Sequence, residues 1–265
     1  MGENNQQETS PELKGNKVLL TTGSSSGIGA ELVKIAAQNQ YNVIVNYNSN
    51  AAGAEQVASA CREFGVEAIT VKADVGSNDD CKKLVATAMD QWGRIDALVN
   101  NAGTTKIVSH GDLHGLDAKD FQDIYQINTI GAFQMIRAAA PALKVSRGSI
   151  VNVASVAGLL GVGTSLAYAC SKAAMLAMNK SMARELGPEI RVNAVCPGFV
   201  EGDWLRNGLG DEIFELVKTH YQNQARTQEV MTPRTVAENI WYFVALAKNI
   251  TGEHLLMDGG ASLPY

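Results

Sequence analysis

Seven short apolar runs, separated by segments long enough for a helix, constrain the fold of this chain more than any other feature. The runs read KVLLTT, NVIVNY, AITVKA, ALVNNA, SIVNVAS, IRVNAV and HLLMDG, and they begin at residues 17, 42, 68, 97, 149, 190 and 254. Valine, isoleucine and leucine are nearly continuous within them. Strands of this composition are buried on both faces, as in a parallel sheet that lies between two layers of helices.

The alternation predicts an α/β chain with a single-domain Rossmann fold: a doubly wound, seven-stranded parallel sheet with helices on both faces. A chain of 265 residues that is 46% hydrophobic can bury one large core. No Pro- or Ser-rich linker and no internal repeat divides residues 14–265, which we therefore expect to form one domain. Residues 1–13 are polar and lack an apolar stretch, so they are predicted to be a disordered tail.

Charge and composition exclude several classes of partner. The net charge is −5, and the 22 basic residues are scattered, so neither nucleic acid nor an anionic membrane is expected to bind. No apolar run reaches the ~18 residues that a membrane span needs. The four cysteines show no C-x-x-C motif and no histidine at metal spacing, which predicts no metal site and favours reduced thiols in the cytoplasm. A small soluble ligand is the expected partner.

A glycine-rich turn, TTGSSSGIGAEL, follows the first predicted strand and opens the first predicted helix. Gly23, Gly27 and Gly29 would let the backbone turn tightly and approach a pyrophosphate at the helix N-terminus. A tight turn that binds nothing is the alternative. Further on, Asp74 ends the third predicted strand, where its carboxylate could accept a hydrogen bond from an adenine amino group.

Tyr168 and Lys172 lie four residues apart in the segment AYACSKAAM. On a helix they would be neighbours on one face and could project together into a cleft. By itself this spacing is equally compatible with a half-buried tyrosine beside a lysine that reaches solvent.

In combination these features resemble the short-chain dehydrogenase/reductase family, of the kind that includes 3-oxoacyl-carrier-protein reductases and glucose dehydrogenases. The resemblance covers about residues 14 to 262 and is carried by TGSSSGIG at 22–29, Asp74, NNAG at 100–103, Asn128, Ser155, Y-x-x-x-K at 168–172 and PG at 197–198. It implies an NAD(P)-binding catalytic domain that transfers hydride between a nicotinamide and a carbonyl or secondary alcohol. It also implies the catalytic set Asn128, Ser155, Tyr168 and Lys172.

The chemistry of these side chains agrees with the implied roles. A carbonyl that accepts hydride develops negative charge on oxygen and needs a hydrogen-bond donor and a proton source. Ser155 would hold the oxygen and Tyr168 would exchange the proton. Because free tyrosine titrates at about 10, we expect the Lys172 ammonium to lower the pKa of Tyr168. The resemblance further implies that Lys172 binds the nicotinamide ribose and that Asn128 anchors a proton-relaying water.

The predicted cofactor-binding residues are Gly23, Ser25, Ser26, Gly27, Ile28, Gly29, Tyr47, Asn48, Asp74, Val75, Asn101, Ala102, Gly103, Tyr168, Lys172, Pro197, Gly198 and Val200. Cofactor preference depends on the residues after the second strand, where an acid favours NAD and a base favours NADP. Tyr47 and Asn48 are neither. With Ser24, Ser25 and Asn48 as neutral donors and no carboxylate to repel a phosphate, NADP(H) is predicted over NAD(H). Family members commonly have a threonine at position 202 that holds the carboxamide. This chain has Gly202 there, so the sequence does not determine how firmly the nicotinamide is positioned.

Residues 198–230 are predicted to be an irregular, mobile substrate lid, because they follow the sixth strand at the end of the sheet where ligands bind. The lid is net acidic, and Gln134 stands where carrier-protein reductases tend to have an arginine, so an acidic carrier protein is expected to be poorly attracted. The loop VAGLLGVGTSLA before Tyr168 and the lid residues Phe199, Trp204, Leu205 and Leu209 predict a largely apolar pocket, so a small or medium uncharged carbonyl or alcohol is the predicted substrate. A 3-oxoacyl-carrier-protein reductase and a non-catalytic dinucleotide sensor or scaffold are the alternatives.

The segments 118–143 and 165–187 are apolar around most of their helical circumference. Helices of this kind need burial on two sides, and one domain offers only one. We expect them to pair between subunits, with the GGASLPY tail as a second contact, in a homotetramer of D₂ symmetry.

Overall fold

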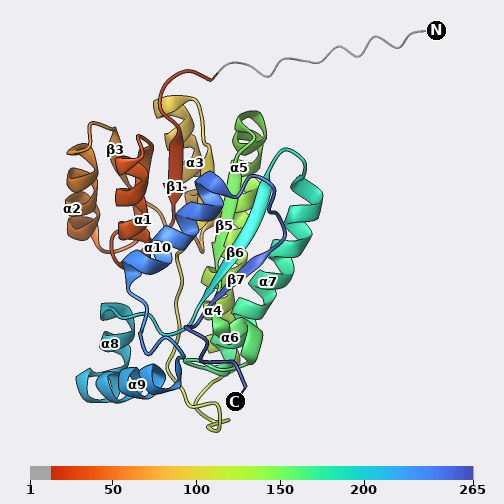
Figure 1. Cartoon of the computed structure of the whole chain (residues 1–265). Helices are drawn as coiled ribbons and strands as arrows, with labels where there is room; N and C mark the ends of the chain where they lie inside the picture. Colours follow the sequence, from red (N-terminus) through yellow and green to blue (C-terminus); the bar gives the residue numbers. More distant parts are fainter. Residues whose placement is uncertain (1–12, 265) are drawn as a thin grey trace.

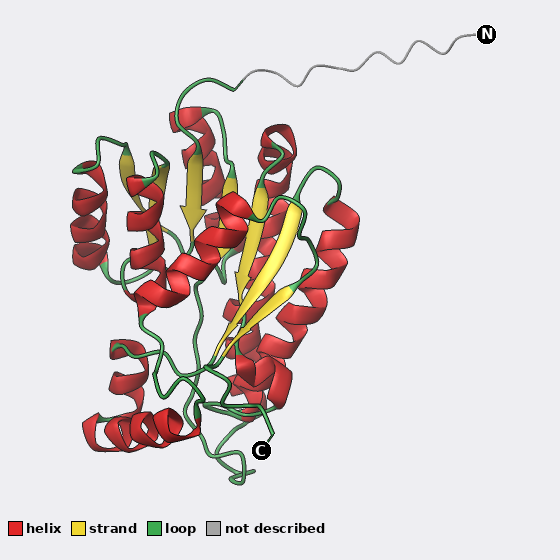
Figure 2. Cartoon of the chain, in the orientation of Figure 1, coloured by secondary structure: helices red, strands yellow, loops and turns green. Residues whose placement is uncertain are grey.

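A computed structural model describes residues 13–264, which form a seven-stranded parallel sheet with helices on both faces (Figures 1 and 2). The strand order is β3-β2-β1-β4-β5-β6-β7. The strands are β1 (Val18–Thr21), β2 (Asn42–Tyr47), β3 (Ala68–Lys72), β4 (Ala97–Asn100), β5 (Ser149–Val153), β6 (Arg191–Pro197) and β7 (His254–Met257). Each predicted apolar run contains one strand, so the predicted fold class is confirmed. The predicted tail, residues 1–13, lies outside the described residues except for Leu13.

Two layers of helices cover the sheet and divide the core in two. On one face lie α1 (Gly27–Gln38), α2 (Ala51–Arg62), α10 (Pro233–Trp241) and the π-helix η2 (Tyr242–Leu246). On the other face lie α3 (Asn78–Trp92), α5 (Ala132–Ser146) and α7 (Leu166–Leu186). Burial of apolar side chains on both faces explains why the strands are almost wholly apolar.

The order of the strands reverses direction at β1, which pairs with both β2 and β4. The loops that leave β1 and β4 therefore go to opposite faces of the sheet and open a crevice beyond the carboxyl ends of these strands, where ligands bind in doubly wound sheets. Three shorter elements surround this end of the sheet: α4 (Ala118–Tyr125), the π-helix η1 (Gln126–Gly131) and α6 (Val156–Leu160). α4 continues through η1 into α5.

The predicted lid is helical, so the expectation of an irregular segment was wrong. Its residues form α8 (Asp203–Leu209) and α9 (Asp211–Gln224), below the carboxyl ends of the strands in Figure 1. α9 has a core of its own, because Phe214 is fully buried and its ring lies 5.4 Å from that of Phe199. Polar residues on the outer face of α9 and glycines at 202, 208 and 210 obscure this pattern in the sequence.

Within residues 13–264, none of the helices combines the length and the apolar character that crossing a membrane requires.

Candidate active site

Two of the three glycines in the turn after β1 leave no room for a side chain. A Cβ atom at Gly29 would lie 2.7 Å from the carbonyl oxygen of Gly23, and one at Gly23 would lie 3.0 Å from the Cα of Ala102. Gly27 differs, because a Cβ there would meet open space, although its φ of +57° disfavours any residue with a side chain. The turn therefore leaves room on its outer side, at Gly27.

The N-terminus of α1 has no side-chain cap. Ser26 is the N-cap residue, yet its hydroxyl accepts no hydrogen bond from the first turn, and that turn holds no acidic residue. The free N–H groups and the positive end of the helix dipole suit an anion. Together with the open space at Gly27, these features fit the pyrophosphate of a dinucleotide, so the residues present agree with the cofactor that the sequence implies.

Asn46 locks the turn to β2 and was missed by the sequence analysis. Its side-chain oxygen accepts a hydrogen bond from the Gly23 N–H at 2.9 Å, and its backbone N–H donates to the Ser24 hydroxyl at 2.9 Å. The sequence signal for this role of Asn46 is a polar residue within the apolar run NVIVNY. Ser24 is fully buried, and its hydroxyl donates to the carbonyl of Thr21 at 2.8 Å. It is therefore unable to reach a cofactor phosphate, contrary to expectation.

The turn after β4 is tied to the glycine-rich turn. The Asn101 side-chain amide donates to the carbonyl oxygens of Thr22 at 3.0 Å and Gly23 at 2.9 Å. Asn100 donates to Asn152 on β5 at 2.9 Å, and Asn152 donates to Asn179 on α7 at 3.0 Å. This chain of buried amides fixes the two turns and α7 in relation to one another.

The remaining predicted cofactor residues lie around the same crevice. Asp74 is partly exposed, and one of its oxygens accepts a hydrogen bond from the Gly76 N–H at 2.8 Å. Tyr47 is partly buried and Asn48 is exposed. Beyond β6, Val200 pairs with Met231 in an isolated bridge, whereas the Gly198 N–H donates to the carbonyl of Met257 at 2.7 Å.

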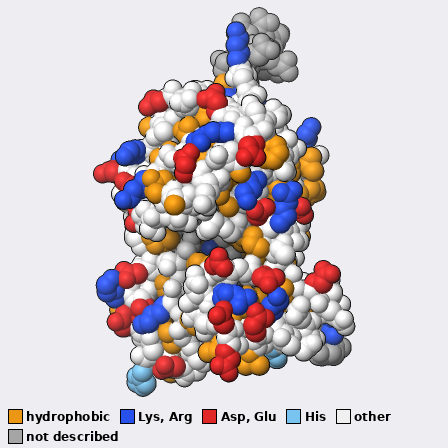
Figure 3. All heavy atoms as spheres, turned by 90° about the vertical axis from the view of Figure 1, so that its left-hand side faces the viewer, with side chains coloured by type: hydrophobic (Ala, Val, Ile, Leu, Met, Phe, Trp, Pro, Cys, Tyr) orange, Lys and Arg blue, Asp and Glu red, His pale blue; other side chains and the backbone are white. Residues whose placement is uncertain are grey.

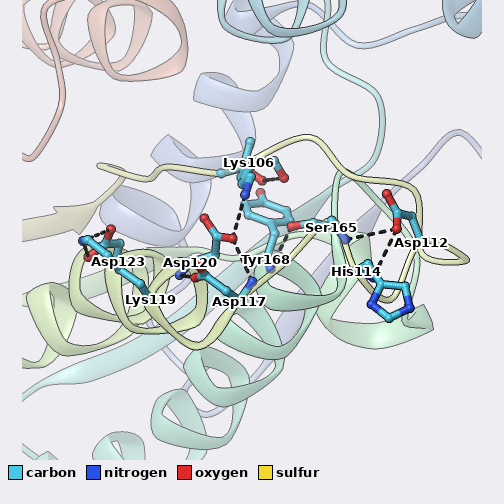
Figure 4. Close-up of polar contacts among 11 residues, drawn as sticks. Lys106, Asp112, His114, Asp117, Lys119, Asp120, Asp123, Ser165 and Tyr168 are labelled. Atoms are coloured by element: carbon cyan, nitrogen blue, oxygen red, sulfur yellow. Dashed lines mark hydrogen bonds and ion pairs between the residues drawn. The ribbon is translucent and has the colours of Figure 1, made fainter.

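Three of the four predicted catalytic residues meet at the carboxyl end of β5. Ser155 follows β5 as the N-cap of α6, and its hydroxyl lies close enough to the Tyr168 phenol to lower the pKa of that group. Tyr168 lies in the first turn of α7, which Ser165 caps (Figure 4). The Lys172 ammonium lies 5.7 Å from the centroid of the Tyr168 ring and donates to the carbonyl of Val153 at 2.7 Å. A Cβ at Gly103 would lie 3.7 Å from the Lys172 nitrogen, which brings the β4 turn to the same place.

Asn128, the fourth residue, sits in the π-helix η1 and is fully buried. Its side-chain oxygen accepts from the Thr104 N–H at 2.8 Å, and its amide donates to the Thr104 carbonyl and to the Ser171 hydroxyl, both at 3.0 Å. Asn128 thus holds the loop after β4 against α7. π-helical turns are frequent at functional sites because they redirect single side chains. Ser171, one residue before Lys172, was missed because a serine in an Ala-rich helix carries no sequence signal.

Burial controls the protonation of the Tyr168 and Lys172 pair. It raises the pKa of Tyr168 to about 12, against the smaller lowering effect of the Ser155 hydroxyl. It also lowers the pKa of Lys172 to about 8. The expectation that Lys172 lowers the pKa of Tyr168 was wrong for this structure, because the ammonium points to the Val153 carbonyl and desolvation of the phenolate dominates.

The loop after β4 forms one rim of the site. Thr105 and Thr164 share a hydrogen bond of 2.7 Å between their hydroxyls, which joins this loop to the segment before α7. Lys106 points to Asp120, with 2.7 Å between nitrogen and oxygen, as Figure 4 shows. The lid forms a second rim, and Figure 3 shows the hollow between the part of the molecule that carries α1 and α2 and the part that carries α8 and α9.

Comparisons with known proteins agree with this geometry. The family model described as "Enoyl-(Acyl carrier protein) reductase" matches residues 23–262. Ketoacyl reductase 2 of the granaticin polyketide synthase of Streptomyces violaceoruber is 38% identical over 247 residues, which cover 93% of this chain and 96% of that protein. The 3-oxoacyl-[acyl-carrier-protein] reductase FabG of Staphylococcus aureus is 34% identical, over 94% of this chain and 99% of its own length.

Solved structures show the same relationship. A protein described as a short-chain dehydrogenase/reductase from Burkholderia xenovorans superimposes with a TM-score of 0.88 at 36% identity, covering 95% of this chain and 100% of that one. NAD⁺-bound xylitol dehydrogenase superimposes with a TM-score of 0.85 at 26% identity, covering 93% and 99%. Fold and site define a dinucleotide-binding type of oxidoreductase. The chain belongs to the short-chain dehydrogenase/reductase family.

Proposed function

We propose that this oxidoreductase uses NAD(P)(H) to interconvert a small or medium uncharged carbonyl compound and its secondary alcohol, with Tyr168 as the general acid and base. The observation that carries the proposal is the meeting of Ser155, Tyr168 and Lys172 at the carboxyl end of β5, beside a glycine-rich turn with an uncapped helix. A sensor or scaffold that only binds a dinucleotide has no need of this arrangement.

The cofactor would lie across the crevice, with its pyrophosphate at Gly27 and the α1 N-terminus and its nicotinamide ribose near Lys172. When bound, the nicotinamide supplies or accepts the hydride. The protein holds the substrate oxygen with the Ser155 hydroxyl and exchanges the proton on that oxygen through Tyr168. At neutral pH Tyr168 is the phenol, which can donate a proton to the oxygen during reduction and take it back during oxidation. A water relay at Asn128 would use its backbone, because its amide already binds Thr104 and Ser171.

We retain NADP(H) as the preferred cofactor. The crevice beside Tyr47 presents no carboxylate at the predicted 2′ position, and Asn48 is exposed there. Lys72 lies opposite Tyr47 in the register of β2 and β3 and is exposed, so it offers a cation near a 2′-phosphate. Ser24 is buried and bound to Thr21, so Lys72 takes its place as a donor to the phosphate.

A 3-oxoacyl-carrier-protein reductase is the second candidate, because the similar granaticin and Staphylococcus aureus proteins carry ketoacyl and oxoacyl reductase names. Gln134 no longer counts against it: its side chain is buried and donates to the Val75 carbonyl at 2.9 Å, so this position is closed to any carrier. The net acidic lid still disfavours an acidic carrier. Four free cysteines support a cytoplasmic location for either activity.

The test is a cofactor titration followed by a panel of ketones, secondary alcohols and a 3-oxoacyl thioester, monitored by the absorbance of reduced nicotinamide. Tyr168→Phe is the key variant. It should bind cofactor as the wild type does and lower kcat at least about 10²-fold, the scale of general acid catalysis. Turnover within a few-fold of the wild type would show that Tyr168 is not the proton donor.

A further inference from the structure

The two helices of the lid are held in different ways. α9 is anchored: Phe214 is fully buried, and the Tyr221 hydroxyl donates to the carbonyl of Asp258 at 3.0 Å. α8 has no buried residue and ends at Gly210, whose φ of +77° only glycine adopts readily. Arg206 connects the helices through ion pairs to Asp211 at 2.9 Å and Glu215 at 2.7 Å. α8 is therefore a short helix that is attached to α9 mainly through Arg206.

α8 places an aromatic ring over the reacting tyrosine. The ring centroids of Trp204 and Tyr168 lie 6.2 Å apart at an interplanar angle of 45°, and 53% of Trp204 is exposed. Gly208 lets the helix lie directly on Ile107, because a Cβ there would come within 2.5 Å of the Ile107 side chain. Because Trp204 lies beside Tyr168 and is half exposed, the substituents of a carbonyl bound at Tyr168 would come close to this indole.

The charged side chain on the facing rim is already paired. Lys106 binds Asp120, and Asp120 also belongs to the capping box of α4 with Asp117. The Lys106 ammonium is thus directed to the helix and not to a substrate anion. Substrate recognition therefore falls to the apolar and aromatic surface of the lid, where the indole of Trp204 favours a flat ring over an alkyl chain through stacking.

We propose that Trp204 determines specificity, favouring carbonyl substrates that carry a planar ring next to the carbonyl. The proposal rests on the reductase function above and names the substrate class of the same site. Stacking of this kind is worth about 2- to 12-fold in affinity, so Trp204 should change the choice between substrates and leave the proton transfer at Tyr168 intact.

The experiment compares three eight-carbon ketones: phenyl methyl ketone, cyclohexyl methyl ketone and 2-octanone. For each, kcat/KM is measured with wild type, Trp204→Ala and Trp204→Phe at saturating reduced cofactor. Each substrate is compared with itself across variants, so differences in intrinsic reactivity cancel. Trp204→Ala should lose about 2- to 12-fold more kcat/KM with the phenyl ketone than with the other two, through KM, and Trp204→Phe should retain most of the preference.

Leu216→Ala is the matched control, since Leu216 is 71% exposed on α9 and should leave all three values unchanged. Quenching of tryptophan fluorescence by the phenyl ketone provides a readout that needs no turnover, and it should disappear in Trp204→Phe, which keeps Trp92 and Trp241. Turnover with equal losses for all three ketones, or quenching that survives in Trp204→Phe, would overturn the role of Trp204. Cofactor binding without turnover of any ketone or alcohol would overturn the reductase function and this proposal with it.

Discussion

Lys172 is 3% exposed, and burial lowers its pKa to about 8 from 10.5. Between these two pH values the unfolded chain binds more protons at this residue than the folded chain does. The free energy of unfolding contributed by Lys172 therefore rises as the pH increases from about 8 to 10.5, and below pH 8 the buried charge costs stability on the order of 3 kcal/mol. Function and stability conflict at this side chain.

Replacing Lys172 by Met should remove this pH dependence. Between pH 7 and pH 10, the free energy of unfolding of the wild type should rise by about 2 kcal/mol more than that of Lys172→Met, because only the wild type loses a buried charge over that range. Denaturant melts at the two pH values measure the change. Lys180→Met, an exposed site on the same helix, is the control. Lys172→Met should also bind the cofactor more weakly than the wild type does. An unchanged cofactor Kd would show that Lys172 does not contact the cofactor.

Cofactor preference is also decided by single residues. Tyr47→Asp should shift the preference to NAD, because a carboxylate repels the 2′-phosphate and binds the ribose hydroxyls, and Asn48→Arg should tighten NADP binding. Titration of each variant with both cofactors measures the ratio of the two Kd values. A wild type that binds NAD at least about tenfold more tightly than NADP would contradict the preference proposed here.

At the scale of elements, the N-terminus of α1 is the part most specialised for a ligand. Its free N–H groups and the open space at Gly27 leave an anion site that a side chain would obstruct. In the lid, α9 is anchored to the rest of the domain, and α8 places Trp204 beside Tyr168. These properties belong to helix ends and helix pairs rather than to individual side chains.

Gly27→Ala should weaken cofactor binding more than it weakens the fold. The new methyl group would project into the space where a pyrophosphate approaches, and the positive φ would cost about 1 kcal/mol of stability. Gly65→Ala is a matched control, because Gly65 has a φ of +79° and open space but lies away from the crevice. Thermal melts should show similar losses for the two variants, and only Gly27→Ala should raise the cofactor Kd. Equal cofactor affinities would place the pyrophosphate elsewhere.

At the scale of the whole molecule, apolar side chains remain uncovered on the helices proposed to pair. Ile130 and Phe133 are 41% and 40% exposed where η1 runs into α5, and Leu166 is 42% exposed at the start of α7. β7 is an edge strand with Leu256 40% exposed. Two separate surfaces of this kind are what a dimer of dimers requires.

Light scattering at micromolar concentration should therefore give the mass of a tetramer. Phe133→Asp should reduce it by breaking the helix contact, because a carboxylate in an apolar interface is left unpaired. Leu216→Asp, a substitution at an exposed leucine on the lid, should leave the mass unchanged. A wild-type monomer would refute the proposed assembly, whereas a stable dimer would keep the helix contact and exclude the contact at the tail.

The sequence by itself determined the seven strands, their parallel arrangement and the glycine-rich turn, because apolar runs and glycine positions are properties of short segments. Tertiary structure alone decided the rest. Asn46 holds Gly23 across 23 positions, and Asn128 acts through Thr104 and Ser171. The direction of the Tyr168 pKa shift depended on burial, which raises it. Such effects arise from residues that are distant in the chain and meet only when it folds, so no local pattern records them.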